Sequence, residues 1–270
     1  MLIAQISDTH IKSQGQLAYE RVDTKKALIL CVEHINNLIP RPDIVIVSGD
    51  LTDSGTIEET LIFKDLIQNL KIPYYIIPGN HDNQEVIREV FKDVSYFEDK
   101  HHLHFFLDLP LKIIALDSTC KNKPYGTLCE DRLTWLEKKL QECENQKSLI
   151  FMHHPPINVG ITHMDKQNLR LGSKELGNIL FKYPNVISIA CGHMHRASYT
   201  LWNNTFISTA PSSSHQVVLD LQKESKEEFI METPAIHLHY WRDNQLTTHI
   251  SYIGNFDGPY PFYDDKGNII

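Results

Sequence analysis

The sequence lacks the features of a membrane or exported protein. No segment of its 270 residues approaches the roughly 20 consecutive apolar residues of a membrane span. The opening stretch, MLIAQISDTH, has no basic n-region, and its apolar run is too short for a signal peptide. These absences predict a cytoplasmic protein without a membrane partner.

Cysteine pairs and a basic excess are also missing. The five cysteines are scattered, without a C-x-x-C pair, which is typical of reduced thiols in the cytoplasm. Acidic side chains number 34 against 26 basic ones, for a net charge of -8. No broad basic surface for nucleic acid is therefore expected, although a local pocket for a phosphate stays compatible with this charge.

In the first third of the chain, segments with the apolar pattern of buried strands alternate with segments that have the apolar spacing of helices. LIAQIS, DIVIVSG and IPYYII are typical of buried strands, and TKKALILCVEHINNL and TIEETLIFKDLIQNL are typical of amphipathic helices. In the second helix, the spacing predicts that Ile57, Leu61, Leu66 and Leu70 face inward. The order strand, helix, strand, helix, strand predicts a parallel sheet with crossover helices.

Further along, the alternation continues and then changes. HHLHFFLDL with LKIIALD predicts paired strands, and KSLIFM and NVISIAC predict strands interleaved with helices. ASYTLWNNTFISTA predicts a hairpin that turns at Asn203 and Asn204, and AIHLHYW with LTTHISYI predicts antiparallel strands. No repeat or linker divides the chain. Residues 1–270 are expected to form one α/β domain with two packed sheets and cap or oligomerisation elements within 211–265.

Polar side chains follow five of the predicted strands, in SDTH, SGDLTD, PGNHD, MHHPP and CGHMH. Ligand sites of α/β sheets lie outside the carboxyl ends of the strands, so these groups should converge. Carboxylate, imidazole and amide groups suit Zn, Mn, Fe or Co. They are too many for one tetrahedral site. Two ions roughly 3.5–4 Å apart that share one carboxylate could accommodate them.

In order and spacing, these blocks resemble the calcineurin-like metallophosphoesterases. They read Asp8-x-His10, Gly49-Asp50, Gly79-Asn80-His81-Asp82, His153 and Gly192-His193-x-His195. The opening ISDTHI, FMHHPP and the tail GPYPFYDD resemble the bacterial class III cyclic nucleotide phosphodiesterase branch, above all its glycerophosphodiesterase members. The resemblance implies a two-sheet αββα sandwich with a C-terminal antiparallel hairpin or cap.

The resemblance also implies a set of metal ligands. Two divalent ions are bridged by Asp50, with Asp8, His10 and His195 on one, and Asn80, His153 and His193 on the other. Each residue has an ordinary alternative as a turn residue, a helix cap or a buried core histidine. Their joint occurrence at successive strand ends favours the metal centre.

Three residues are implied to act beside the metals. His81 is implied to stabilise the transition state or to protonate the leaving oxygen, and Asp82 is expected to orient it by accepting its other N–H. Alternatively, Asp82 caps the following helix. His215 resembles a family position near substrate, so the expected substrate contacts are Asn80, His81 and His215.

Other polar residues near the motifs are expected to have supporting roles. His154 should point away from the ligand beside it and either serve the structure or support the ligands, and Asp117 is expected to support the ligands. The histidines of HHLH, residues 101–104, resemble a second metal patch, but they lack carboxylates and a strand-end context and are expected on an exposed strand surface. The loops 11–22, 156–172 and 211–265 are expected to set selectivity.

The resemblance implies a hydrolase of small phosphodiesters, namely 3′,5′-cyclic nucleotides, glycerophosphodiesters or both. A hydroxide held between two divalent ions (Fe, Mn, Zn or Co) is expected to attack phosphorus. A phosphomonoesterase, a nuclease of the same superfamily and a non-catalytic interaction module remain alternatives. The net charge of -8 argues against a nucleic-acid partner. The resemblance further implies a homo-oligomer, with the hairpin 234–253 as a candidate contact.

Overall fold

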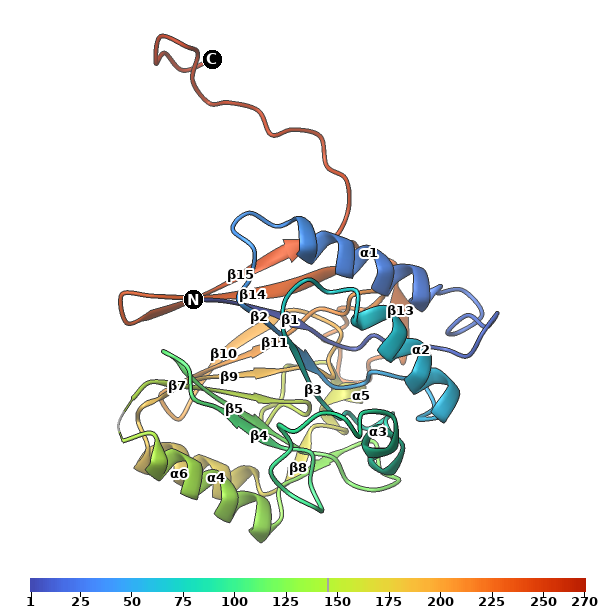
Figure 1. The fold of residues 1–270 in the computed structure, drawn as a ribbon, viewed down its shortest axis with the longest axis vertical. Coiled ribbons are helices and arrows are strands. Elements are labelled where there is room, and N and C mark those ends of the chain that lie inside the picture. The colour runs from blue at the N-terminus through green and yellow to red at the C-terminus, as the bar shows by residue number, and fades with distance from the viewer. Residues whose placement is uncertain (145) are drawn as a thin grey trace.

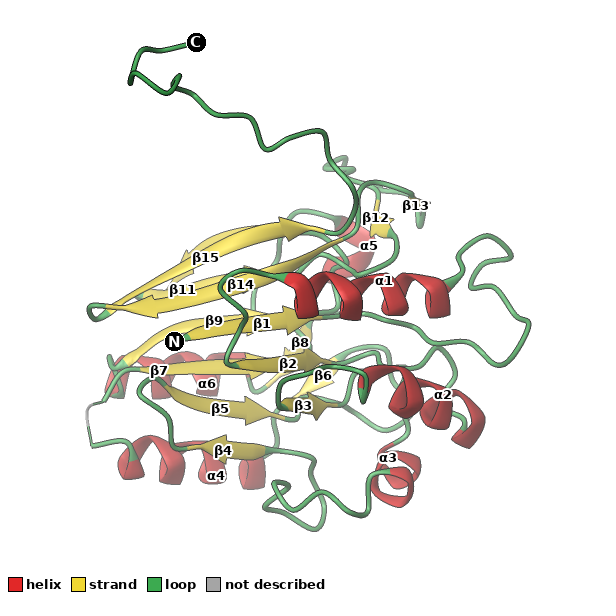
Figure 2. Ribbon diagram, turned by 45° about the horizontal axis from the view of Figure 1, so that its top comes forward, coloured by secondary structure: helices red, strands yellow, loops and turns green. Residues whose placement is uncertain are grey.

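Two β-sheets stacked face to face form the centre of the molecule, and helices lie outside them (Figures 1 and 2). The computed structural model describes residues 1–144 and 146–270. The strand orders are β15-β14-β1-β2-β3 in the first sheet and β10-β11-β9-β7-β5-β4 in the second. The predicted αββα sandwich is confirmed.

The first sheet joins parallel strands from the start of the chain to a hairpin from its end. β1 runs parallel to β2, and β2 to β3, whereas β14 lies antiparallel to β1 and to β15. The predicted C-terminal hairpin therefore completes the sheet beside the first strand. The bounds are β1 Leu2–Ile6, β2 Ile44–Ser48, β3 Tyr74–Ile77, β14 Ala235–Arg242 and β15 Gln245–Tyr252.

The second sheet is parallel at its centre and antiparallel at both edges. Asn203 and Asn204 have φ of 48° and 60°, as the tight turn between β10 and β11 requires. The bounds are β4 Phe105–Leu107, β5 Lys112–Leu116, β7 Ser148–Met152, β9 Val186–Cys191, β10 Ser198–Trp202 and β11 Thr205–Thr209. Two small pairs flank the sheets: β6 Gly126–Thr127 with β8 Leu169–Leu171, and β12 Gln216–Val217 with β13 Phe229–Ile230.

The uniformly apolar strands are buried on both faces. In β2, Ile44 and Ile46 point between the sheets, whereas Val45 and Val47 point toward the helices. Each such side chain contributes about 1.5–3 kcal/mol on burial. Because both faces of these strands are covered, polar side chains can reach a cavity or solvent only at the strand ends. The motifs lie at these ends.

Helices cover both outer faces of the stacked sheets (Figure 2). α1 and α2 pack over the first sheet, and α4 and α6 over the second. α3 packs against the cluster that includes α2, and α5 is a single turn. The bounds are α1 Thr24–Asn37, α2 Ile57–Ile67, α3 Gln84–Val90, α4 Glu130–Glu142, α5 Thr162–Asp165 and α6 Ser173–Lys182.

The predicted inward face of α2 is wrong in part. Ile57 and Leu61 are 47% and 51% exposed, whereas Thr60, Phe63 and Ile67 are buried. Apolar residues occur nearly all round this helix, so its periodicity leaves the inward stripe ambiguous. Packing against the neighbouring helices and the sheet decides which stripe is buried.

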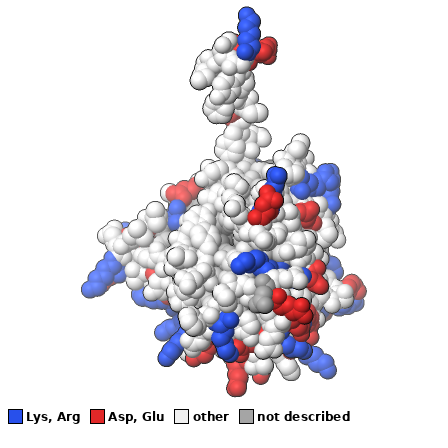
Figure 3. All heavy atoms as spheres, turned by 90° about the vertical axis from the view of Figure 1, so that its left-hand side faces the viewer, with Lys and Arg blue, Asp and Glu red and all other residues white. Residues whose placement is uncertain are grey.

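The chain ends in an extended arm that leaves the body (Figures 1 and 2). Residues 254–270 are all exposed, and they include the aromatic segment GPYPFYDD. Figure 3 shows this arm above a face on which Lys and Arg side chains are interspersed with Asp and Glu. In the part of the chain that the structure describes, no helix combines the length and apolarity needed to cross a membrane.

Candidate metal centre

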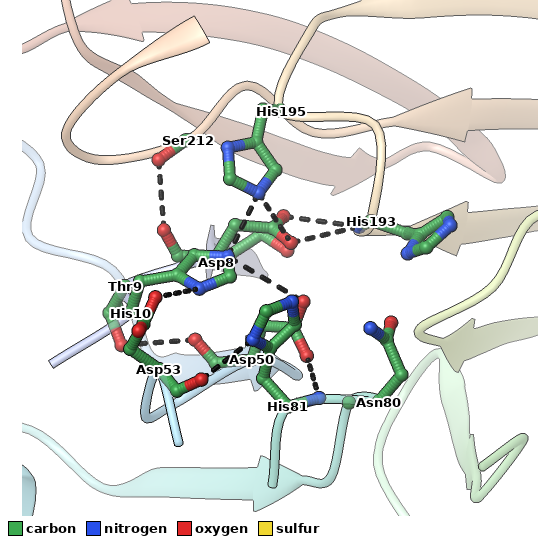
Figure 4. Close-up of polar contacts among 12 residues, drawn as sticks. Asp8, Thr9, His10, Asp50, Asp53, Asn80, His81, His193, His195 and Ser212 are labelled. Atoms are coloured by element: carbon green, nitrogen blue, oxygen red, sulfur yellow. Dashed lines mark hydrogen bonds and ion pairs between the residues drawn. The ribbon is translucent and has the colours of Figure 1, made fainter. Parts of the chain in front are cut away.

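The loops that follow β1, β2, β3, β7 and β9 meet at one edge of the stacked sheets. Figure 4 shows Asp8, His10, Asp50 and His195 pointing toward one another there. All predicted ligands except the half-buried Asn80 are buried. The predicted residues that the structure brings together are Asp8, His10, Asp50, Asn80, His81, His153, His193, His195 and His215.

The turns that carry these side chains have an unusual backbone. Left-handed φ values between 44° and 69° occur at Asp8, His10, Asp50, His193 and His195. Residues other than glycine adopt this conformation at a cost of roughly 1–3 kcal/mol each. Hydrogen bonds between the turns offset this cost, among them His10 N to Asp50 O at 3.0 Å. The strain is concentrated where the polar groups converge, as is common at functional sites.

Two glycines let the turns approach closely. A Cβ at Gly49 would lie 2.4 Å from Nδ1 of His153, and a Cβ at Gly79 would lie 2.2 Å from Oδ1 of Asp50. The backbone at each glycine therefore touches a side chain from another strand end. This contact explains why a glycine precedes the polar residue in both motifs.

In the first cluster, two carboxylates face two imidazoles. Nε2 of His10 and Nε2 of His195 are 2.9 Å apart. Nε2 of His10 lies 3.6 Å from Oδ2 of Asp50, and Nε2 of His195 lies 3.4 Å from Oδ1 of Asp8. One ligand atom from each of these residues lies within 4.8 Å of the others. The set has the charge and the donor types of a divalent metal site.

In the second cluster, hydrogen-bond acceptors converge with no proton between them when the His153 ring is neutral. Nδ1 of His153 donates to the carbonyl of Ser48 at 2.8 Å, so Nε2 of the neutral ring has only a lone pair. That Nε2 lies 3.1 Å from Oδ1 of Asn80 and 3.3 Å from Oδ2 of Asp50. Three acceptors at this separation repel one another unless a cation or a proton lies among them. The residues therefore fit a metal ion.

The electrostatics of the site favour added positive charge. Burial opposes the charge of His153, but Asp50 and Asp8 outweigh it and raise its pKa to about 9. Burial raises the pKa of Asp8 to about 6. Burial lowers the pKa of His193 to about 3, so this ring is neutral and keeps a lone pair, as metal ligands must.

His81 lies over the first cluster. Its backbone N–H donates to Oδ1 of Asp50 at 2.9 Å, and its Nδ1 donates to the carbonyl of Asp53 at 2.7 Å. The ring centre lies 4.6 Å from that of His10. The Asp53 carbonyl fixes the tautomer, so Nε2 of neutral His81 has a lone pair.

The expected contact between Asp82 and the His81 ring is wrong. The Asp82 carboxylate accepts from the backbone N–H groups of Leu51, Thr52 and Gly79 at 2.9–3.0 Å. It turns back beneath the loop after β2, where those donors need a buried acceptor. Asp82 is not the helix cap either, because Asn83 accepts from the first turn of α3.

A cavity of about 390 Å³ opens over the clusters, and His10, Asp50, His81, His193 and His195 lie in its wall. The His215 ring is 4.7 Å from that of His195 and 5.2 Å from that of Tyr19. The loops expected to set selectivity supply Tyr19, His163, Met164, Gln167, His215, Val217, Glu227, Glu228 and Phe229.

His154 does not point away from His153, the ligand beside it, as expected, because the centres of these two rings lie 4.8 Å apart. Its ring centre lies 4.8 Å from that of His193, and its Nδ1 lies 2.9 Å from Oγ of Ser118. The strand ends at Met152, so the alternation of side chains does not extend to His154. Burial lowers its pKa well below the usual range, so the ring is neutral.

Asp53 is a functional residue that the motifs do not single out. Its Oδ1 lies 3.4 Å from Nδ1 of His10, its Oδ2 lies 2.8 Å from Nζ of Lys12, and its carbonyl holds His81. The available signal was its position three residues after Asp50 in SGDLTD. Asp53 therefore contacts both a predicted ligand, His10, and the predicted catalytic imidazole, His81, and holds them in place.

Asp117 and the HHLH segment lie outside the two clusters. Asp117 is fully buried and accepts from Gln84, Leu103 and Thr119. The expectation of an exposed HHLH surface is wrong for His104, which is 1% exposed and stacks on Trp135 at 3.9 Å. Helix α4 covers this histidine, which the local sequence does not reveal.

Comparison with known proteins agrees with the metal centre that the geometry indicates. The calcineurin-like phosphoesterase family matches residues 1–197. A probable glycerophosphodiester phosphodiesterase, GpdQ of Arcobacter nitrofigilis, is 54% identical over 272 residues, which cover 100% of both chains. The 3′,5′-cyclic adenosine monophosphate phosphodiesterase CpdA of Escherichia coli K12 is 30% identical, over 92% of this chain and 88% of CpdA.

A solved structure shares the fold at low identity. A dimetal phosphatase from Danio rerio superposes with a TM-score of 0.70 and 12% identity, over 93% of this chain and 95% of that one. The predicted phosphodiesterase is supported by relatives that carry phosphodiesterase names. The matched region contains every residue of both clusters. The chain is therefore a member of the calcineurin-like phosphoesterase family.

Proposed function

We propose that the protein is a dinuclear metal-dependent phosphodiesterase that hydrolyses small phosphodiesters, namely glycerophosphodiesters, 3′,5′-cyclic nucleotides or both. The main support is the convergence of acceptors in the second cluster, where Nε2 of His153 lies 3.1 Å from Oδ1 of Asn80 and 3.3 Å from Oδ2 of Asp50. The names of the relatives supply the substrate class.

The proposed ligands are divided between two ions per subunit, each Fe, Mn, Zn or Co. Asp50 lies between the clusters, 3.6 Å from Nε2 of His10 and 3.3 Å from Nε2 of His153, and is the proposed bridge. When bound, the ions would supply Lewis-acid activation of water and of the phosphate oxygens. Asp8, His10 and His195 would hold the first ion, and Asn80, His153 and His193 the second.

His81 is the proposed acid or electrostatic stabiliser at the leaving oxygen. Nδ1 is committed to the Asp53 carbonyl, so only Nε2 is available for a proton. When Nε2 carries a proton, it can donate to a phosphate oxygen or to the departing alcohol. The hydrogen bond from the His81 backbone N–H to Asp50 fixes the position of His81 relative to this proposed bridging carboxylate.

Asp82 is proposed to act by fixing the turns that carry the reacting groups. Its bonds to Gly79, Leu51 and Thr52 join the GNH turn to the GDL turn. Asn80 and His215 are the proposed substrate contacts with His81, because all three line the cavity above the clusters.

Metal analysis combined with a hydrolysis panel tests this function. The protein is stripped of metal, reloaded with Fe, Mn, Zn or Co, and assayed with cyclic AMP, glycerophosphoethanolamine, bis(p-nitrophenyl) phosphate and p-nitrophenyl phosphate. The expected result is two ions per chain and metal-dependent cleavage of diesters in preference to the monoester. Stronger turnover of the monoester, or equal activity of the stripped protein, would contradict the proposal.

We further propose that the protein is cytoplasmic and acts as a homo-oligomer. The five cysteines are free, which suits a reducing compartment. The C-terminal arm exposes Phe262 and Ile269 to 84% and 80%, an arrangement that favours burial against another copy. Sedimentation velocity on the full chain and on a truncation after Ile253 tests the homo-oligomer. If both proteins have the same number of subunits, the arm has no role in assembly.

A further inference from the structure

A second cavity lies on the other side of Asn80 and His81. Its volume is about 650 Å³, and it shares these two residues with the cavity above the clusters. A diester whose phosphate lies over the clusters has two alcohol groups, and the two cavities offer one space for each. Their charges differ, so the two spaces are not equivalent.

The second cavity is basic, although the protein as a whole is acidic. Four cationic side chains line it, Arg88, Lys100, Lys121 and Arg132, against the two carboxylates of Glu85 and Asp82. Lys121 pairs with Glu85 at 2.9 Å, and Arg132 lies 3.4 Å from the buried Asp117. Within residues 1–144 and 146–270, no carboxylate lies within 4.0 Å of Arg88 or Lys100. Two cations in this wall are therefore uncompensated.

Arg88 is held in place by neutral groups. One of its terminal nitrogens, Nη2, donates to the carbonyls of Asp99 and His102, each at 3.0 Å. Carbonyls orient the guanidinium without neutralising it. A fixed guanidinium without a carboxylate partner, beside a polar cavity, suits a carboxylate or a phosphate, to which its Nε and Nη1 N–H groups can donate.

The cavity above the clusters has the opposite character. Glu227 and Glu228 line it, and no Lys or Arg is among the described residues in its wall. An alcohol with a negative substituent would be repelled by these carboxylates and attracted to the other side. The pair of cavities therefore distinguishes the two ends of a charged diester.

We propose that the basic cavity binds an anionic group, a carboxylate or a phosphomonoester, carried on one alcohol of the substrate. This inference rests on the proposed phosphodiesterase function and specifies which diesters the site favours. Arg88 and Lys100 are specificity-determining residues, and the shared wall of Asn80 and His81 separates the anionic alcohol from the other one.

A matched substrate pair tests the proposal on the metal-loaded enzyme. Glycerophosphoserine and glycerophosphoethanolamine differ by one carboxylate, and the measured quantity is the ratio of their kcat/KM values. Lys100→Glu and Arg88→Gln should each lower this ratio by roughly fivefold, the size of one charge interaction near a protein surface. Sodium chloride at about 1 M should reduce the wild-type ratio in the same direction, because it screens exposed charges.

The control is Lys138→Glu, an identical charge reversal at an exposed position of α4 outside both cavities. It should leave the ratio unchanged. A ratio that falls equally in Lys138→Glu overturns the proposal, and a ratio that does not fall in Lys100→Glu excludes a carboxylate as the bound group. Lys100 is exposed and forms no hydrogen bond or ion pair with the described residues, so this variant keeps the test valid if Arg88→Gln fails to fold.

A second pair separates the two anions. Glycerophosphoinositol 4-phosphate compared with glycerophosphoinositol reports on a phosphomonoester, as glycerophosphoserine does on a carboxylate. Dependence on Lys100 in one pair alone identifies the anion that the cavity takes, and dependence in neither overturns the proposal.

Calorimetric binding separates this inference from the proposed function. O-phosphoserine and O-phosphoethanolamine differ by the same carboxylate and need no turnover. If the enzyme cleaves no diester, the proposed function fails, but a roughly fivefold preference for O-phosphoserine that Lys100→Glu removes still supports the basic cavity. If diesters are cleaved and neither assay depends on Lys100 or Arg88, only the inference fails.

Discussion

Two groups of neighbouring histidines differ in what surrounds them. The strand-end group comprises His10, His153, His193 and His195, and Asp8 and Asp50 lie among their nitrogens. The loop group comprises His101, His102 and His104. Its members are close in sequence, whereas those of the strand-end group are spread over nearly the whole matched family region. Proximity in sequence is therefore a poor guide to a metal site.

The loop group already has internal partners that oppose a metal. Nδ1 of His102 accepts from Nε of Arg132 at 3.1 Å, which leaves the proton of the neutral ring on Nε2. Nε2 lies on the side of Cys129 and Asp131, whose ligand atoms come within 4.8 Å of His102. A protonated nitrogen beside an arginine cannot bind a cation. Close spacing of metal-ligand residues is not sufficient without free lone pairs and excess negative charge.

The largest expected effect comes from removing the carboxylate shared by both halves of the strand-end group. Asp50→Ala should abolish metal pairing and lower turnover of bis(p-nitrophenyl) phosphate by roughly a thousandfold or more, because both ions lose a ligand. Metal content by mass spectrometry and the hydrolysis rate measure this. As a control, Asp131→Ala removes an exposed carboxylate from the loop group and should change neither the metal content nor the hydrolysis rate. Near wild-type activity of metal-free Asp50→Ala would disprove the proposed mechanism.

The next effect concerns a residue beside the metals that is not a proposed ligand. His81→Ala should slow turnover by about a hundredfold while both ions remain bound, because Nε2 acts on the substrate and Nδ1 is occupied by the Asp53 carbonyl. The loss should be smaller for a diester with a good leaving group, such as bis(p-nitrophenyl) phosphate, than for glycerophosphoethanolamine. Loss of an ion in this variant would instead make His81 a ligand.

The strand ends could be predicted because their information is local. A buried apolar run shows where each strand stops, and the polar residue that follows must emerge at the edge of the sheet, as Asp8, Asp50 and His193 do. The resemblance to the family then implied how these residues are grouped. The alternation of strands and helices supplied the two-layer fold in the same way.

The failures concern contacts that bring distant segments together. Asp82 could turn to His81 or to the backbone, and the loop after β2 decides by presenting the N–H groups of Leu51 and Thr52. Trp135 on α4 decides that His104 is buried. Neither contact leaves a signal in the few residues around the side chain concerned.

The buried member of the loop group should affect stability as a function of pH. Burial lowers the pKa of His104 from 6.5 to about 4. Between these values the unfolded chain binds more protons than the folded one, so the free energy of unfolding rises with pH. This contribution is complete above about pH 6.5 and is lost as the pH falls toward 4, a difference of roughly 2–3 kcal/mol.

His104→Phe should keep the stacking on Trp135 and remove this titration. Urea unfolding of metal-loaded wild type and variant at pH 7.5, 6 and 5 measures the difference between them. The variant should lose less stability than wild type on acidification, by roughly 2 kcal/mol at the lowest pH. A parallel loss in both proteins would mean that His104 keeps an ordinary pKa in the folded state.

The smallest expected effect is the most direct check of the comparison. Cys129→Ser removes the softest ligand atom near His102, and metal content and diester turnover should stay within error of wild type, since Arg132 already occupies Nδ1 of that histidine. Removing the charge with Arg132→Met is the sharper step. If the loop group of Arg132→Met binds Zn, the arginine alone excludes the ion from the wild-type protein. Adding Cys129→Ser to Arg132→Met should then prevent this binding. If the loop group of Arg132→Met still binds none, the missing carboxylate excess is the stronger reason that only the strand-end group forms a metal centre.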